Sequence, residues 1–190
     1  MRPVMLQSIP LLSLLILAGC GGSQAPPTPT LPPPQGVTNH DLGIRLASVP
    51  ADFKVVKNQG DILELAPSDP AVAGNVVFSL GPEGEVNLVA AMKAHRRHIE
   101  EQPGGEYKGG QELVTPLGSA FYSRGRYSAG DQEMEETVVV VLDPGAQRIL
   151  YMTYRYPAGA DSSVRVQQLL DLLGEVESAS SSAAGGAANE

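Results

Sequence analysis

Val138-Val139-Val140-Val141-Leu142 is a strand-length run with no polar side chain. A strand that is apolar at every position is typical of a central strand with both faces covered. Asp143-Pro144-Gly145 follows with strong turn chemistry, and Ile149-Leu150-Tyr151-Met152 then offers a partner strand. The sequence therefore predicts an antiparallel hairpin at the centre of a sheet.

Shorter runs on both sides of this hairpin predict the other elements. The expected strands cover residues 43–47, 53–57, 62–66, 76–80, 112–115, 120–128, 136–142 and 148–156. One helix is expected over 88–102, with Asn87 as its N-cap and Pro103 as its stop. A last helix should begin at Asp161 or Ser162, because apolar residues then recur at i, i+3, i+4 and i+7. The predicted fold class is α+β, an antiparallel sheet of about six strands packed between helices.

The N-terminus carries a targeting signal. Arg2 precedes an apolar run that is interrupted by Pro10 and is shorter than the roughly twenty residues that cross a bilayer. The run ends in Leu17-Ala18-Gly19-Cys20, which resembles the bacterial lipobox. The resemblance implies cleavage between Gly19 and Cys20 and diacylglyceryl modification of Cys20, so that membrane lipid becomes a partner. A plain secretory signal beside an unrelated cysteine is the alternative.

Composition divides the remainder into a tether, a domain and a tail. Residues 1–19 are the expected signal peptide, and 20–39 are the acylated cysteine and a proline-rich tether. Such a stretch favours polyproline II and acts as a semi-rigid spacer, or alternatively as a docking ligand for a partner. Residues 40–177 are the expected globular domain. Residues 178–190 contain no large apolar side chain and are expected to be disordered.

Charge and cysteine usage exclude some partners and chemistries. The chain has 13 basic and 21 acidic side chains, a formal net charge of −8, and no run of basic residues. Nucleic acid is therefore not an expected partner. Cys20 is the only cysteine, so no intrachain disulfide can form.

Gly43-Ile44-Arg45-Leu46 followed by Val49-Pro50-Ala51-Asp52-Phe53 resembles the opening of the PsbP-like domain, with an apolar strand and a Pro-x-x-aromatic turn. The later order of hairpin, helix, meander and closing helix is also similar. The resemblance covers about residues 42–176 and implies an α/β/α sandwich. It also implies binding or accessory work rather than catalysis. No functional residue of that family can be assigned to a position here.

The motifs of catalysis and metal binding offer little indication of an enzyme or a metal site. The sequence has no GxSxG, HExxH, P-loop, GxGxxG or EF-hand pattern. His95 and His98 are spaced to share one helix face, but Arg96 and Arg97 would repel a cation, so a packed or surface pair is expected and no metal or cofactor is predicted. Glu133, Glu135 and Glu136 are expected to form a solvated strand edge rather than an acid–base pair.

Tyrosine and arginine suggest an interaction surface, because these residues anchor many interfaces. The candidate residues are Tyr122, Arg124 and Arg126 on one face of a strand, and Tyr151 and Arg155 on one face of a strand two further along. The alternative is that Arg124 and Arg126 pair with neighbouring glutamates while the tyrosines cover the sheet or a helix.

Together these features predict a lipid-anchored, non-catalytic module of the cell envelope that binds a protein partner. A small-ligand-binding lipoprotein is the second interpretation, and an enzyme is the third. In a bacterium with two membranes the anchor would lie in the outer membrane facing the periplasm, because Gly21 stands where retained lipoproteins commonly carry Asp. With one membrane it would lie in the outer leaflet of the cell membrane.

Overall fold

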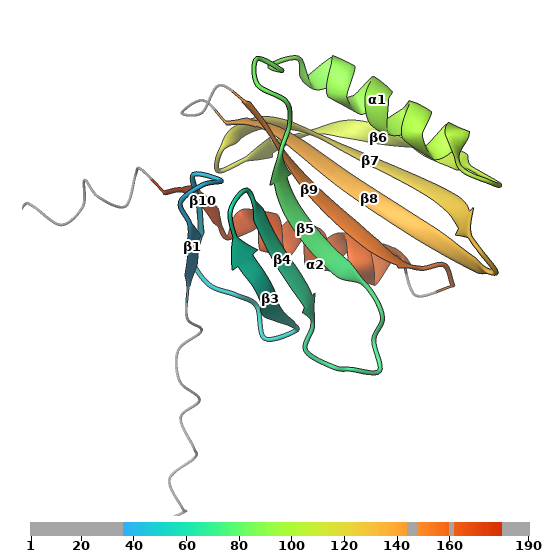
Figure 1. The fold of residues 1–190 in the computed structure, drawn as a ribbon, viewed down its shortest axis with the longest axis horizontal. Helices are drawn as coiled ribbons and strands as arrows, with labels where there is room; N and C mark the ends of the chain where they lie inside the picture. The colour runs from blue at the N-terminus through green and yellow to red at the C-terminus, as the bar shows by residue number, and fades with distance from the viewer. Residues whose placement is uncertain (1–35, 144–147, 160–161, 180–190) are drawn as a thin grey trace, which may run out of the picture. The chain divides into compact units, whose positions relative to one another are not determined.

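Seven antiparallel strands form the main sheet, in the order β3-β4-β5-β9-β8-β7-β6 (Figure 1). Their bounds are β3 Phe53–Gln59, β4 Ile62–Pro67, β5 Asn75–Leu80, β6 Glu106–Thr115, β7 Gly118–Ala129, β8 Gln132–Asp143 and β9 Arg148–Pro157. The computed structural model describes residues 36–143, 148–159 and 162–179. The predicted turn residues Pro144 and Gly145, the lipobox, the acylation site Cys20 and residues 180–190 lie outside these ranges.

A second sheet joins the two ends of the domain. It contains β1 (Val37–Asn39), β2 (Ile44–Leu46) and β10 (Val176–Ser178), with β2 in the middle. The predicted strand over 43–47 lies in this second sheet, and the main sheet has seven strands where about six were expected. Regular structure also begins before residue 40 and includes Ser178, which was expected to start the tail.

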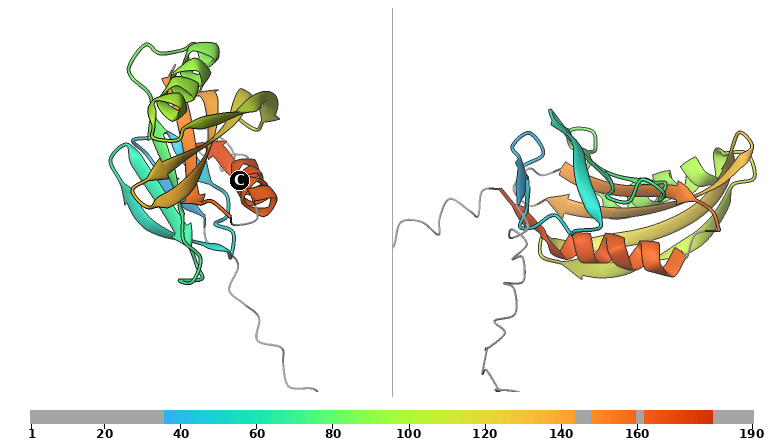
Figure 2. Two further views of the ribbon diagram at one scale, coloured as in Figure 1. Left: turned by 90° about the vertical axis from the view of Figure 1, so that its right-hand side faces the viewer. Right: turned by 90° about the horizontal axis from the view of Figure 1, so that it is seen from below.

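Two helices lie on opposite sides of the main sheet (Figure 2). α1 covers Leu88–Glu101, and the Asn87 side chain accepts a 3.0 Å hydrogen bond from the Ala90 N–H, so the predicted N-cap is confirmed. α2 covers Ser162–Gly174 and buries Leu169, Leu172 and Leu173. The α+β class with a sheet between helices is confirmed.

β8 is buried on both faces, as its apolar run predicts. Val139 and Val141 belong to the larger core cluster, which also holds the buried leucines of α2. Val138 and Val140 pack in a smaller cluster with Ala91 of α1. Each buried valine contributes about 1.5–3 kcal/mol relative to an exposed one, so β8 stabilises the packing on both sides of the sheet.

β6 is longer than the predicted segment at 112–115. It begins at Glu106 and shifts register between Tyr107 and Gly109, where Gly109 has a positive φ of 103°. Two adjacent glycines remove the alternation that would have marked a strand. No helix within the described residues is long and apolar enough to cross a membrane.

Candidate functional site

The most unusual side chain on the α1 side of the sheet is Glu136. Strand alternation places it on the same face as Val138 and Val140, beneath α1, and it is only 2% exposed. The prediction of a solvated acidic edge is therefore wrong for Glu136. A buried carboxylate needs compensating partners, because removing its hydration is costly.

α1 supplies the first partner. His95 lies on the buried stripe of the helix, and its Nε2 is 3.2 Å from Oε1 of Glu136, although this contact is turned away from ideal hydrogen-bond geometry. The other ring nitrogen, Nδ1, shares a 2.6 Å hydrogen bond with Oγ of Ser123 on β7. His98, one turn later, brings its Nε2 within 3.9 Å of the same Glu136 oxygen.

β9 supplies the second partner. Arg155 stands directly opposite Glu136 in the β8–β9 ladder, and its Nε donates a 2.5 Å hydrogen bond to Oε2. Directly opposite residues of antiparallel strands lie on the same face, which accounts for the contact. The Arg155 side chain is 47% exposed, so the ion pair joins a buried carboxylate to a half-exposed guanidinium.

These contacts hold Glu136 in its ionised form. Burial by itself raises the pKa of Glu136, but the contacts with His95 and Arg155 outweigh it and lower the pKa to about 2. Burial likewise disfavours the charged form of Arg155, and the Glu136 carboxylate reverses this and raises the pKa of Arg155. The pair therefore remains charged at physiological pH.

Ser123, His95 and Glu136 superficially resemble a nucleophile–base–acid triad. Ser123 is only 2% exposed, however, and lies under α1, so a substrate carbonyl has no approach to its hydroxyl. A working triad needs a reachable nucleophile with an oxyanion site beside it. The arrangement fits a buried polar network that fixes α1 on the sheet.

A hollow of about 280 Å³ opens beside this network, between α1 and β9. Its lining includes His95, His98, Glu136, Tyr151 and Arg155. Although His95, His98 and Glu136 lie near one another, no group of three or more His, Cys, Asp or Glu within the described ranges is arranged to hold a metal ion.

The sheet beside the hollow has no helix over it. α1 packs on β6, β7 and β8 and also against Ile149 and Tyr151 of β9, which leaves the α1 side of β4, β5 and the later part of β9 uncovered (Figure 1). We call this surface the open face; its side chains include Ile62, Glu64, Asn75, Val77, Ser79, Thr153 and Arg155. These seven are partly or fully exposed, whereas the side chains between them that point to the α2 side are buried: Leu63, Leu65, Val76, Phe78, Met152 and Tyr154.

The predicted Tyr/Arg surface divides between the two sides of the sheet. Tyr122 is in register with Val139, and Val139 with Met152. Both partners belong to the core cluster that holds the buried leucines of α2, so Tyr122, Arg124 and Arg126 lie on the α2 side of the sheet. Tyr151 and Arg155 lie on the α1 side. The five residues therefore do not form one surface, although each strand's own set does share a face.

The two halves of the predicted surface have different surroundings. On the α2 side, Arg126 pairs with Glu133 at 2.5 Å, as the alternative interpretation expected, and Tyr122 packs against the core. On the α1 side, the Tyr151 hydroxyl donates to Glu85 at 3.2 Å, and burial together with the Glu85 charge raises the pKa of Tyr151 to about 12. Arg155 is the predicted residue that reaches the hollow with an exposed charge.

Sequence reasoning missed the role of Glu136. The signal was present, because Glu136 follows the same alternation as Val138 and Val140. The position of α1 over this particular face, which decides whether the carboxylate is buried, is not encoded in that alternation.

No family model matches the chain, and no curated protein matches it in sequence. Its fold is nevertheless shared with solved structures. LpqN, involved in cell envelope biogenesis of Mycobacterium tuberculosis, is 18% identical with a TM-score of 0.50 over 76% of this chain and 84% of that one. The Ran-binding protein Mog1p of Saccharomyces cerevisiae is 13% identical with a TM-score of 0.52 over 78% and 97%.

Cyanobacterial PsbP from Synechocystis, also 13% identical, covers 85% of this chain and 98% of its own with a TM-score of 0.48. At these identities the similarities concern the fold alone. The chain has the α+β fold that Mog1p and LpqN share, with a sheet between helices as the sequence predicted.

Proposed function

We propose that this chain is a lipid-anchored, non-catalytic module of the bacterial cell envelope that binds a protein partner through the open face. The observation that carries the proposal is the uncovered half of the sheet beside the hollow at Arg155. A sheet usually buries both faces in an α/β/α arrangement or leaves a polar face to water. Here the face mixes apolar Ile62 and Val77 with charged side chains, as the rim and core of an interface do.

The proposed location follows from the N-terminal sequence. Acylation of Cys20 with a diacylglyceryl group supplies two chains, enough for stable anchoring. The chain shares its fold with LpqN, which is involved in cell envelope biogenesis, and this agrees with the proposed location. In a host with two membranes we propose the outer membrane, facing the periplasm.

The experiment compares the full chain with a Cys20→Ser variant in the native host. After crosslinking in living cells, membranes are separated and the captured proteins are identified. We expect the full chain in the membrane fraction with one dominant partner, and Cys20→Ser in the aqueous fraction with reduced capture. If Cys20→Ser stays in the membrane, or if no partner is reproducible, the corresponding half of the proposal is wrong.

A small-ligand-binding protein is the second candidate, and the hollow favours it. Its volume of about 280 Å³ is just below the range of roughly 300–1,000 Å³ that is typical of ligand sites. Binding of a ligand to the native state would raise the melting temperature of the full chain. A thermal-shift screen that finds such a compound, with Arg155→Gln abolishing the shift, would favour this candidate.

A further inference from the structure

Arg155 is positioned so that its guanidinium can bind an anion. Its Nε donates a hydrogen bond to the buried Glu136, which ties the guanidinium to β8. Within the described residues, its two terminal nitrogens donate no hydrogen bond. A guanidinium presents such a pair of N–H donors in the geometry that a carboxylate accepts in bidentate fashion.

The other accessible polar groups of the hollow are also suited to an anion. His98 is 46% exposed, and the Thr153 hydroxyl lines the same hollow on β9. Glu136 is 2% exposed, so its charge anchors Arg155 without being presented to a ligand. Two other acids on this side of the sheet are already hydrogen-bonded: Glu85 accepts from the Tyr151 hydroxyl, and Glu64 accepts from the Asn75 amide.

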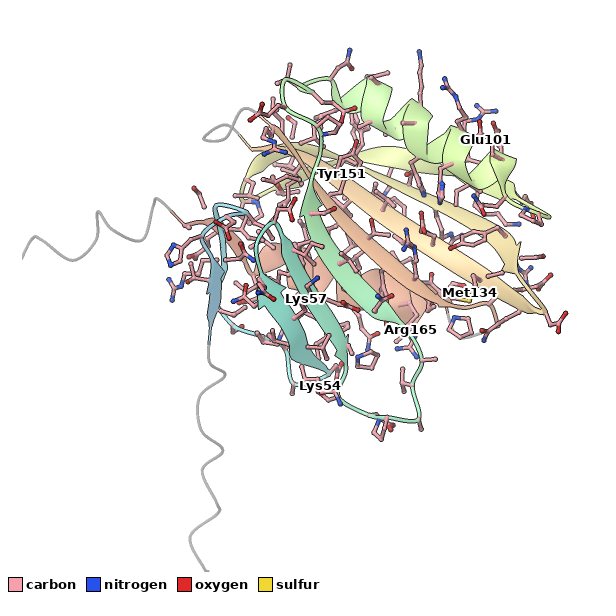
Figure 3. The ribbon with its side chains drawn as sticks, viewed as in Figure 1. Lys54, Lys57, Glu101, Met134, Tyr151 and Arg165 are labelled. Atoms are coloured by element: carbon pink, nitrogen blue, oxygen red, sulfur yellow. The ribbon has the colours of Figure 1, made fainter. Side chains whose placement is uncertain are left out.

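The open face continues from the hollow to a basic margin on β3. Lys57 is in register with Glu64, and Lys54 with Ala66, which puts both lysines at the far edge of this face. Figure 3 shows Lys54 and Lys57 along β3 and Tyr151 near α1. A chain with a net charge of −8 thus places exposed cations at both margins of its uncovered surface.

We propose that the open face binds an acidic segment of a protein partner, with one Asp or Glu carboxylate of that segment seated in the hollow on Arg155, His98 and Thr153. This inference rests on the proposed function and specifies the chemistry of its partner. The hollow can hold a side chain, and β9 and β3 are three strand spacings apart, about 14 Å, which an extended segment of about five residues spans, so that its further acids meet the lysines. Charge complementarity of this kind gives specificity and faster association.

The test places a photo-crosslinking amino acid at Val77, on the open face but outside the groups that would hold the carboxylate, in the full chain in its native host. Val114 on β6, which is 93% exposed and away from the open face, is the control position. Captured peptides are sequenced by mass spectrometry. The captured segment is then synthesised in two forms, one unchanged and one with each Asp and Glu replaced by Asn and Gln. The binding of each form to the purified full chain is measured.

We expect capture at Val77 but not at Val114, and a captured segment that contains Asp or Glu. Replacing its acids by amides, or Arg155 by Gln, should weaken binding at least about tenfold, since a charge-assisted bidentate contact is lost. Because Arg155→Gln also leaves Glu136 without its cation, a His98→Gln, Thr153→Val double variant tests the hollow independently. Arg124→Gln, on the opposite side of the sheet, should leave binding unchanged.

The outcomes separate the two proposals. Equal capture at both positions, or none at Val77, overturns the open face as the interface and with it the proposed function at this surface. Capture at Val77 of a segment without acids, of a lipid or of a second copy of this chain overturns the carboxylate inference. Unchanged binding by the double variant overturns it as well, while the function as an interaction module stands.

Discussion

Glu136 is the only acidic side chain among the described residues that is buried, and its surroundings explain why it tolerates burial. Arg155 reaches it from the neighbouring strand and His95 from α1, so one carboxylate ties a helix to two strands. Breaking a buried pair by removing one partner costs more than the pair contributes to stability, because the remaining group loses its compensation.

Glu136→Gln should lower the free energy of unfolding by about 2–3 kcal/mol, less than for a fully buried pair because Arg155 is half exposed and can be solvated. Glu133→Gln is the matched control: it removes an exposed pair with Arg126 and should cost less than about 1 kcal/mol. Urea unfolding of both variants measures the difference. Equal losses would show that burial of Glu136 is not what stabilises the α1 layer.

The stabilisation by Glu136 should also depend on pH. The pKa of Glu136 is lowered from 4.5 to about 2 in the folded chain, so the unfolded chain takes up the proton first as the pH falls. The stabilisation is complete above about pH 4.5 and is lost between there and pH 2, by roughly 3 kcal/mol at one pKa unit per 1.36 kcal/mol. The gap between the wild-type chain and Glu136→Gln should close over this window, and a constant gap would contradict the assignment.

At the scale of elements, the close packing of α1 on the sheet depends on a glycine in β7. A Cβ on Gly125 of β7 would lie 2.5–2.9 Å from three side-chain carbons of Ile99, which is itself fully buried. The helix therefore approaches β7 more closely there than any larger residue permits. The same close approach brings His95 within reach of Ser123 and Glu136.

Gly125→Ala should destabilise the chain by about 1–2 kcal/mol, because overpacking outweighs the entropy that alanine removes from the unfolded state. In an Ile99→Ala background, where the clash is gone, the same substitution should cost nothing. Gly174→Ala, whose added Cβ would meet nothing within 4 Å, is the control and should change stability by less than about 0.5 kcal/mol. Additive effects of Gly125→Ala and Ile99→Ala in urea unfolding would rule out the close contact.

At the scale of the whole domain, the distinctive feature is that a strand from its C-terminal end pairs with a strand from its N-terminal end. β10 pairs with β2, and Val176 is fully buried against the same core as Ile44 and Leu46. The Ala179 N–H also donates to the Gly43 carbonyl at 2.8 Å, so the last described residues complete the small sheet.

A chain shortened to end at Gly174 should lose more than about 3 kcal/mol, from burial of Val176 and from the ladder bonds of β10. A chain that ends at Ala179 keeps these contacts and is expected to retain its stability. Thermal and urea unfolding of the two shortened chains provide the measurement. If both unfold like the full chain, β10 does not contribute to the stability of the domain.

Much of the element order was predictable because it depends on local patterns. The apolar run at Val138–Leu142, the cap at Asn87 and the stripe of α2 each follow from side chains adjacent in sequence or one turn apart. The start of β6 was missed because Gly109 and Gly110 interrupt its alternation. The strand over 43–47 was predicted, but the second sheet in which it lies was not, since its partners come from the two ends of the domain.

The sequence by itself determined the α+β class, the positions of both helices and which residues of one strand share a face. Only the tertiary structure decided that Glu136 is buried, that Arg155 opposes it and that the Tyr/Arg set divides between two sides of the sheet. The physical reason is register: a shift of one residue between neighbouring strands moves every side chain to the other face. That register, and the face on which α1 lands, depend on contacts between segments far apart in the chain.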